Sequence, residues 1–140
     1  MDILKIPFHY LVGINNCLND EFIYEIDEKP EYLNHLGTIH ACMQLTLAEA
    51  TAGEFLLREF KEYESAFIPV VRRTNAKYNK PANGKLCSKA AFFELSKSQI
   101  LDELNSKNRC LLKINVEIFD AGYNKTLSVI FDWFITKKTT

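Results

Sequence analysis

The stretch from residue 41 to about residue 60 is the feature that most constrains the fold. It contains no proline, and apolar residues fall on nearly every side of the helix that it predicts. A helix of this kind is stable when it is buried most of the way round. Its apolar residues are Met43, Leu45, Leu47, Ala48, Ala50, Ala52, Phe55 and Leu56. The rest of the chain is therefore expected to wrap around one long central helix.

Two segments near the C-terminus alternate apolar and polar residues, which is typical of strands with one buried face. They cover residues 110–118 and 127–135, and a turn that contains glycine joins them at residues 120–124. This pattern predicts an antiparallel hairpin.

Three further strands and a second helix complete the predicted order. Residues 66–76 and 85–95 predict two strands separated by a turn cluster, and residues 22–26 predict a shorter one. A capping-box pattern at Ser96 predicts a short amphipathic helix that ends near Asn105. We therefore expect an α+β fold, an antiparallel sheet wrapped around the long helix, with residues 1–140 as one domain.

Charge and cysteine placement exclude several classes of function. The 140 residues carry 17 Lys and Arg against 18 Asp and Glu, a net charge of −1, so no basic surface for nucleic acid is expected. Four cysteines lie far apart, with no pair or cluster at metal-ligand spacing, and we expect reduced thiols and no metal site. They are Cys17, Cys42, Cys87 and Cys110.

Targeting and membrane signals are not recognisable in the sequence. The first residues lack a small-residue cleavage site, and no run approaches the roughly 20 apolar residues that span a bilayer. We expect a cytoplasmic protein.

A motif surrounds the start of the predicted long helix. Asn34, Gly37 and His40 are followed by Ala41, Cys42, four further residues and the triplet Leu47-Ala48-Glu49. This segment resembles the hotdog-fold acyl-thioesterases of the phenylacetate-pathway type, whose motif is N-x-x-G-x-x-H-G-G, four residues, then L-A-D/E. The order of elements near the C-terminus is similar to a hotdog branch in which thioesterase activity is only inferred. The resemblance covers most of the chain.

The resemblance implies a hotdog fold and hydrolysis of an acyl thioester such as acyl-CoA, without a cofactor or metal. It implies that Glu49 activates a water or attacks directly, while the Ala41 N–H and Asn34 polarise the carbonyl. We expect the substrate to contact His40, Gly37, Cys42, Arg73 and Lys77. Of these, the cations Arg73 and Lys77 are expected to face the phosphates of coenzyme A.

Helix geometry adds a constraint on oligomeric state. Ala41 and Glu49 are eight residues apart, which places them about 12 Å apart along one helix. One thioester carbon cannot contact both, so if both residues act on one substrate, the carboxylate must come from a second chain. The family resemblance also implies a homodimer, or a homotetramer built as a dimer of dimers.

The sequence departs from the motif at one position that matters. Ala41 and Cys42 stand where the family has two glycines, and the Ala41 methyl group narrows the approach to the backbone N–H. A non-catalytic module that binds acyl-CoA or fatty acid therefore remains the alternative. Hydration of an enoyl thioester is less favoured, because the histidine and acid signature of those families is absent.

Each candidate residue also has a purely structural interpretation. Glu49 can be a structural acid, Asn34 a loop residue and His40 a residue that orients the turn. Cys42, near a helix N-terminus, can be a nucleophile or a small packing residue. Five phenylalanines suggest an apolar tunnel for the acyl group: Phe55, Phe60, Phe67, Phe92 and Phe93.

Overall fold

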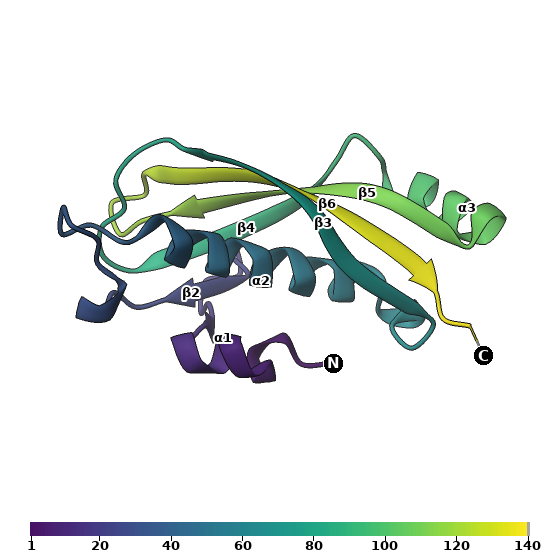
Figure 1. The fold of residues 1–140 in the computed structure, drawn as a ribbon, viewed down its shortest axis with the longest axis horizontal. Helices are drawn as coiled ribbons and strands as arrows, with labels where there is room; N and C mark the ends of the chain where they lie inside the picture. The colour runs from purple at the N-terminus through teal and green to yellow at the C-terminus, as the bar shows by residue number, and fades with distance from the viewer. Residues whose placement is uncertain (140) are drawn as a thin grey trace.

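A long helix lies against one face of a six-stranded antiparallel sheet (Figure 1). The computed structural model describes residues 1–139. The strand order in the sheet is β1-β2-β4-β5-β6-β3, so β1 and β3 form its two edges. The strands are β1 (Asn15–Asn16), β2 (Tyr24–Ile26), β3 (Phe67–Tyr78), β4 (Leu86–Phe93), β5 (Arg109–Phe119) and β6 (Lys125–Lys137).

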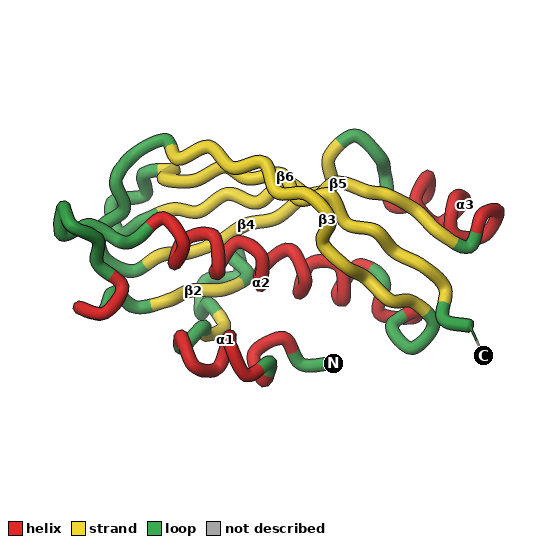
Figure 2. Tube along the Cα trace, in the orientation of Figure 1, coloured by secondary structure: helices red, strands yellow, loops and turns green. Residues whose placement is uncertain are grey.

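The helices are short except for the central one (Figure 2). They are α1 (Pro7–Val12), α2 (Ala41–Glu59) and α3 (Lys97–Lys107), with 3₁₀ turns η1 (Ile3–Lys5), η2 (Pro30–Tyr32) and η3 (Lys61–Tyr63). The predicted long helix, the C-terminal hairpin and the capping box of α3 are confirmed: Ser96 Oγ accepts from the Gln99 N–H, and Gln99 Oε1 accepts from the Ser96 N–H. The predicted strand at residues 22–26 is shorter, beginning at Tyr24.

Helix α1 is an element that the sequence analysis did not predict. Pro7 stands at its first position, where a missing N–H costs nothing, and Gly13 ends it with a left-handed φ of 76°. Both signals are present in the sequence, but six residues are too few to reveal a periodic apolar pattern.

Helix α2 is buried on most sides, as its composition predicts. Leu47, Ala48 and Ala52 are fully buried, and only Cys42 and Arg58 of this helix are exposed in the described chain. Two polar contacts tie the helix to the sheet. The Thr51 hydroxyl lies 2.6 Å from that of Ser88 on β4, and the Thr126 hydroxyl of β6 donates to Gln44 Oε1 at 2.7 Å. These satisfied polar groups fix the helix in one position on the sheet.

Strand β3 is a long edge strand. It pairs with β6 along its length, with a bulge between Val71 and Arg73, and its other edge pairs with no strand of residues 1–139. Ile68 and Val70 on this strand are exposed. The other exposed residues of this strand include Arg72, Arg73, Thr74, Asn75 and Lys77, so the edge is apolar only near its start. An unpaired strand edge of this length still offers backbone groups for pairing with another chain. None of the described helices is long and apolar enough to cross a membrane.

Candidate active site

The loop before α2 is built around the Asn34 side chain. Its Oδ1 accepts hydrogen bonds from the backbone N–H groups of Leu36 (2.9 Å) and Thr38 (3.1 Å). Its Nδ2 donates to the Thr38 hydroxyl at 3.0 Å. Gly37 closes the turn with a φ of 75°, a conformation that favours glycine. The amide of Asn34 is therefore engaged within its own loop.

The first turn of α2 leaves one backbone donor free. His40 is the N-cap, and its Nδ1 accepts a hydrogen bond from the Cys42 N–H at 3.0 Å. Within residues 1–139, no protein group accepts a hydrogen bond from the Ala41 N–H. This N–H lies at the partially positive end of a 19-residue helix. It can therefore donate to an oxygen that gains negative charge.

Tyr78 joins the end of β3 to the start of α2. Its hydroxyl donates to the Ala41 carbonyl oxygen at 3.1 Å. Burial, together with the nearby Cys42 thiol, raises the pKa of Tyr78. The phenol therefore stays neutral and keeps its proton for this hydrogen bond.

Glu49 meets a histidine that the sequence analysis did not single out. His9 of α1 is buried, and its Nε2 lies 3.6 Å from Glu49 Oε2. The Glu49 side chain is 43% exposed, whereas that of His9 is 7% exposed. The carboxylate therefore faces solvent on one side and a fixed imidazole on the other.

The second ring nitrogen of His9 fixes the proton arrangement of the pair. His9 Nδ1 lies 2.9 Å from the Ile3 carbonyl oxygen, which can only accept, so Nδ1 carries a proton. In neutral His9, Nε2 is then an unprotonated acceptor that faces Glu49.

The predicted site residues form two groups. Asn34, Gly37, His40, Ala41 and Cys42 gather at the start of α2. Glu49 lies eight residues further along the same helix, beside His9.

The two predicted cations lie on β3. The Arg73 side chain is 78% exposed, with its Nε 3.9 Å from Asp132 Oδ2, and Lys77 is exposed one residue before Tyr78. Within residues 1–139, no hydrogen bond or ion pair joins either side chain to a residue of the motif. Both cations are exposed along the β3 edge, and Arg73 also faces the carboxylate of Asp132.

Three of the five phenylalanines expected to line a tunnel pack against one another. Phe92 packs edge-to-face against Phe55 and Phe60, with ring centroids 4.9 and 5.9 Å apart. These rings fill the space between α2 and β4. Phe93 is exposed, and Phe67 stacks on Tyr63.

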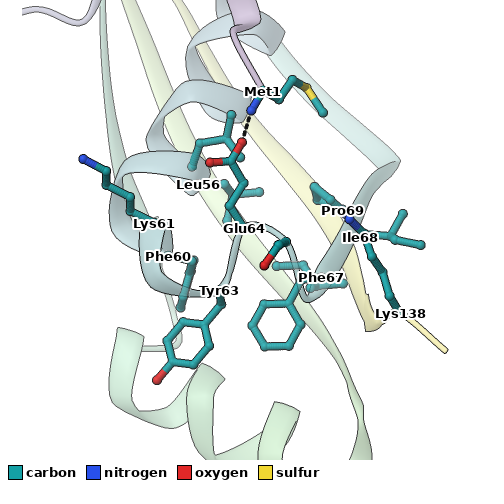
Figure 3. Close-up of a pocket in the computed structure, with 13 residues that line it drawn as sticks. Met1, Leu56, Phe60, Lys61, Tyr63, Glu64, Phe67, Ile68, Pro69 and Lys138 are labelled. Atoms are coloured by element: carbon teal, nitrogen blue, oxygen red, sulfur yellow. Dashed lines mark hydrogen bonds and ion pairs between the residues drawn. The ribbon is translucent and has the colours of Figure 1, made fainter. Parts of the chain in front are cut away.

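A hollow of about 650 Å³ lies at the far end of α2 (Figure 3). Phe60, Tyr63 and Phe67 line it, and the N-terminal amine contacts Glu64 at its rim. No residue of the predicted site lines it. It is therefore separate from the two groups described above.

A family comparison covers most of the chain. The family model described as "Domain of unknown function (DUF4442)" matches residues 11–135. The chain belongs to this family. A search of curated proteins found no match for the DUF4442 chain.

Solved structures of other proteins resemble this DUF4442 chain closely in fold. A Pseudomonas aeruginosa protein of unknown function, described as a probable thioesterase, is 18% identical with a TM-score of 0.81 over 97% of this chain and 91% of its own. A Haemophilus influenzae thioesterase is 14% identical, with a TM-score of 0.72; the match covers 96% of this chain and 86% of that protein. A Bacillus halodurans protein solved with CoA is 16% identical, with a TM-score of 0.70; the match covers 91% of this chain and 74% of that protein. The DUF4442 chain therefore has the hotdog fold, as the motif resemblance implies.

Proposed function

We propose that this protein hydrolyses acyl thioesters, with coenzyme A as the thiol carrier. The observation that carries the proposal is the Glu49 carboxylate, which is partly exposed on an otherwise buried helix and contacts the buried His9. A carboxylate held at a fixed imidazole, with one side open to water, is suited to general-base work. Two fold relatives agree with this chemistry, since one is named a thioesterase and the other was solved with CoA.

The thioester carbonyl binds at the start of α2 in this proposal. Its oxygen accepts a hydrogen bond from the Ala41 N–H, which has no protein acceptor within residues 1–139. Negative charge develops on that oxygen as water attacks the carbonyl carbon. The N–H and the helix dipole stabilise this charge, and one such donor contributes about 100- to 1,000-fold in rate.

Glu49 accepts the proton of the attacking water. The hydroxide adds to the carbonyl carbon, and the protonated carboxyl then donates toward His9 Nε2. The carbon–sulfur bond breaks as the tetrahedral intermediate collapses, and the thiolate leaves with the bonding electron pair. The proton held by Glu49 passes to the thiolate, which restores the carboxylate.

Two chains supply each site. The unpaired edge of β3 offers the surface for a second copy, and its last residue, Tyr78, bonds to Ala41 at 3.1 Å. A partner docked along β3 therefore reaches the start of α2. The Ala41 N–H of one subunit then works with Glu49 of the other, in a dimer or a dimer of dimers, with residues 1–140 as one hotdog domain.

The remaining motif residues have supporting roles. Asn34 and Gly37 hold the loop, and His40 caps α2 through the Cys42 N–H, which leaves the Ala41 N–H without a protein acceptor within residues 1–139. Arg73 and Lys77, both exposed on β3, meet the phosphates of coenzyme A. The Cys42 side chain borders the acyl group.

One observation favours a second candidate function. The Ala41 methyl group stands where a glycine would leave the N–H open. If it blocks the carbonyl, the protein binds acyl-CoA or fatty acid without turnover.

A substrate panel separates the two functions. Purified protein is incubated with acyl-CoAs from acetyl to palmitoyl, and released CoA is quantified by chromatography, because the exposed Cys42 would consume a thiol reagent. Hydrolysis of at least one substrate, lost in Glu49→Gln, agrees with the thioesterase. Binding without CoA release on every substrate agrees with the binding module.

A further inference from the structure

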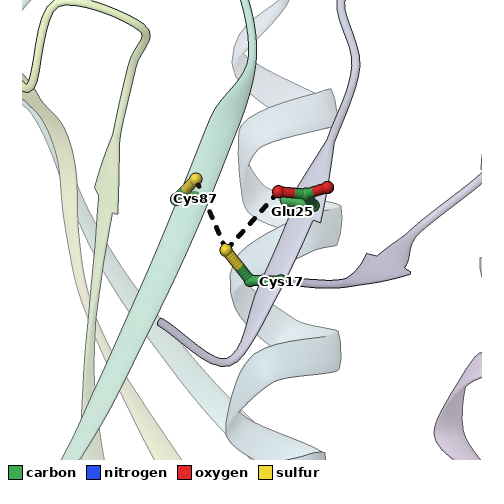
Figure 4. A group of neighbouring side chains, drawn as sticks. All are labelled: Cys17, Glu25 and Cys87. Atoms are coloured by element: carbon green, nitrogen blue, oxygen red, sulfur yellow. Dashed lines mark hydrogen bonds between the residues drawn. The ribbon is translucent and has the colours of Figure 1, made fainter. Parts of the chain in front are cut away.

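Three side chains far apart in the sequence meet at the β1 edge of the sheet (Figure 4). Glu25 on β2 is the register partner of Cys87 on β4. Cys17 follows β1, where its N–H donates to the Ile23 carbonyl oxygen at 3.3 Å. The sequence predicts no cluster at ligand spacing, because Cys17 and Cys87 are 70 positions apart. Strand pairing brings them together.

We propose that Cys17, Glu25 and Cys87 form a binding site for a thiophilic divalent cation, with Zn²⁺ as the representative ion. The proposal is independent of thioester hydrolysis. No residue of the candidate active site belongs to this group.

The distances between the three side chains fit tetrahedral coordination. The two Sγ atoms are 4.0 Å apart, Cys17 Sγ is 3.4 Å from Glu25 Oε2, and all three ligand atoms lie within 4.8 Å of one another. A tetrahedral zinc ion, with Zn–S near 2.3 Å and Zn–O near 2.1 Å, requires S···S of about 3.8 Å and S···O of about 3.6 Å. Small side-chain rotations are therefore enough to admit the ion.

A disulfide fits the same atoms less well. It requires an S–S bond of about 2.05 Å, roughly half the observed separation of 4.0 Å. Strand β2 also lies between β1 and β4 in the sheet. A disulfide would need the backbone segments on either side of β2 to draw together, whereas a metal ion between the two sulfur atoms needs only small side-chain rotations.

The surrounding charges favour a divalent cation. With both thiols deprotonated by the metal, two thiolates and one carboxylate carry three negative charges, which a divalent cation offsets in part. The Lys85 ammonium is shared between Glu25 and Asp27, 3.5 Å from an oxygen of each. Lys85 Nζ lies 3.5 Å from Glu25 Oε1, so the other carboxylate oxygen, Oε2, stays directed at Cys17. At metal sites, the carboxylate oxygen that does not bind the ion is commonly hydrogen-bonded to a neighbouring group, which orients the carboxylate toward the metal.

The site is open on one side. A hollow of about 390 Å³ lies over it, lined by all three side chains and by Lys85, Phe22 and Phe119. The Glu25 side chain is only 17% exposed, and both cysteines are half-buried. Three protein ligands leave the fourth tetrahedral position to a water in this hollow.

Metal titration tests the site without any activity assay. Chelator-treated, reduced protein is titrated with Zn²⁺ by calorimetry and with Co²⁺ by absorption spectroscopy. We expect one ion per chain, with a thiolate-to-cobalt charge-transfer band in the near ultraviolet. Cys17→Ser and Cys87→Ser are expected to weaken Zn²⁺ binding at least 10-fold, and Glu25→Gln to weaken it measurably. The matched control is Cys42→Ser, which removes an exposed thiol at the start of α2 and should bind as the parent does.

Several results would overturn the proposal. They are the absence of Zn²⁺ binding by the reduced parent protein, a Co²⁺ spectrum without thiolate bands, and unchanged affinity in both serine variants. A Cys17–Cys87 disulfide that forms in air in a protein that binds no Zn²⁺ when reduced would also overturn it. The cobalt spectrum of the parent protein decides the matter even if a variant fails to fold.

Discussion

Nε2 of His9 lies 3.6 Å from Oε2 of Glu49, although the two residues are 40 positions apart in the chain. Helix α1 presents the ring, and the Ile3 carbonyl holds it through Nδ1 at 2.9 Å. The ring nitrogen that faces Glu49 is therefore an acceptor when His9 is neutral. In the proposed mechanism, His9 is a positioning residue: it orients the Glu49 carboxylate that would take a proton from water.

The variant His9→Asn distinguishes the contact of this ring with the Ile3 carbonyl from its contact with Glu49. The asparagine amide can keep a donor near the Nδ1 position for Ile3 but places no nitrogen against Glu49. We expect kcat to fall about 10- to 100-fold while KM changes little, with the melting temperature changed by only a few degrees. An unaltered kcat would show that His9 only packs α1 onto the fold.

Ala41→Pro removes the proposed carbonyl donor while keeping the helix. Ala41 is the first residue of α2, where proline is well tolerated, and His40 already has the extended conformation that precedes proline, with φ −60° and ψ 139°. We expect kcat to fall about 100- to 1,000-fold, the loss that follows removal of one carbonyl-binding donor.

Ala41→Val is the matched control for this change, because it adds bulk but retains the N–H. It should keep far more activity than the proline variant. Equal losses in both variants would assign the effect to bulk and not to the donor. Circular dichroism establishes whether α2 is intact in each.

Asn34→Asp and Asn34→Ala distinguish loop support from substrate contact. The aspartate keeps the oxygen that accepts from the Leu36 and Thr38 N–H groups and loses only the Nδ2 donor. We expect Asn34→Asp to retain activity within about threefold and Asn34→Ala to lose about 1 kcal/mol of stability or more. A large loss of kcat in the aspartate variant, with unchanged stability, would mean that the amide donates to substrate.

The four thiols should differ widely in reactivity. Cys42 is exposed, whereas burial, together with a contact to Glu103, raises the pKa of the buried Cys110 thiol to about 12. The thiolate is the nucleophile, so at pH 8 iodoacetamide should modify Cys42 more than about 100-fold faster than Cys110. Cys110 should react appreciably only as the pH rises toward 12 or when the protein unfolds. Peptide mass spectrometry at timed intervals measures both rates, and similar rates at pH 8 would contradict the burial of Cys110.

The sequence was most informative where local pattern and packing agree. The apolar residues of α2 and the alternation in β5 and β6 predict those elements because one helix and one sheet face share the core. Short α1 has no such pattern, and its contact with Glu49 depends on how the whole chain folds back on α2.

The candidate site shows the same division. The spacing from Asn34 to Glu49 predicts a loop followed by one helix, and the structure has Asn34, Gly37 and His40 before α2 and Ala41 and Glu49 within it. The meeting of Cys17 with Cys87, and of His9 with Glu49, arises from strand pairing and helix docking over long separations. Sequence spacing alone carries no signal for either contact.

Subunit complementation tests the central claim, that Glu49 of one chain and the Ala41 N–H of its partner hydrolyse one thioester. Glu49→Gln and Ala41→Pro proteins, each nearly inactive alone, are mixed at equal amounts, exchanged under mild denaturant, and assayed for CoA release from the best acyl-CoA substrate. In a heterodimer one of the two symmetric sites receives both intact groups, so the mixture should recover roughly a quarter of wild-type activity. A mixture that stays as inactive as its parents, although mass spectrometry detects the heterodimer, would contradict the shared site.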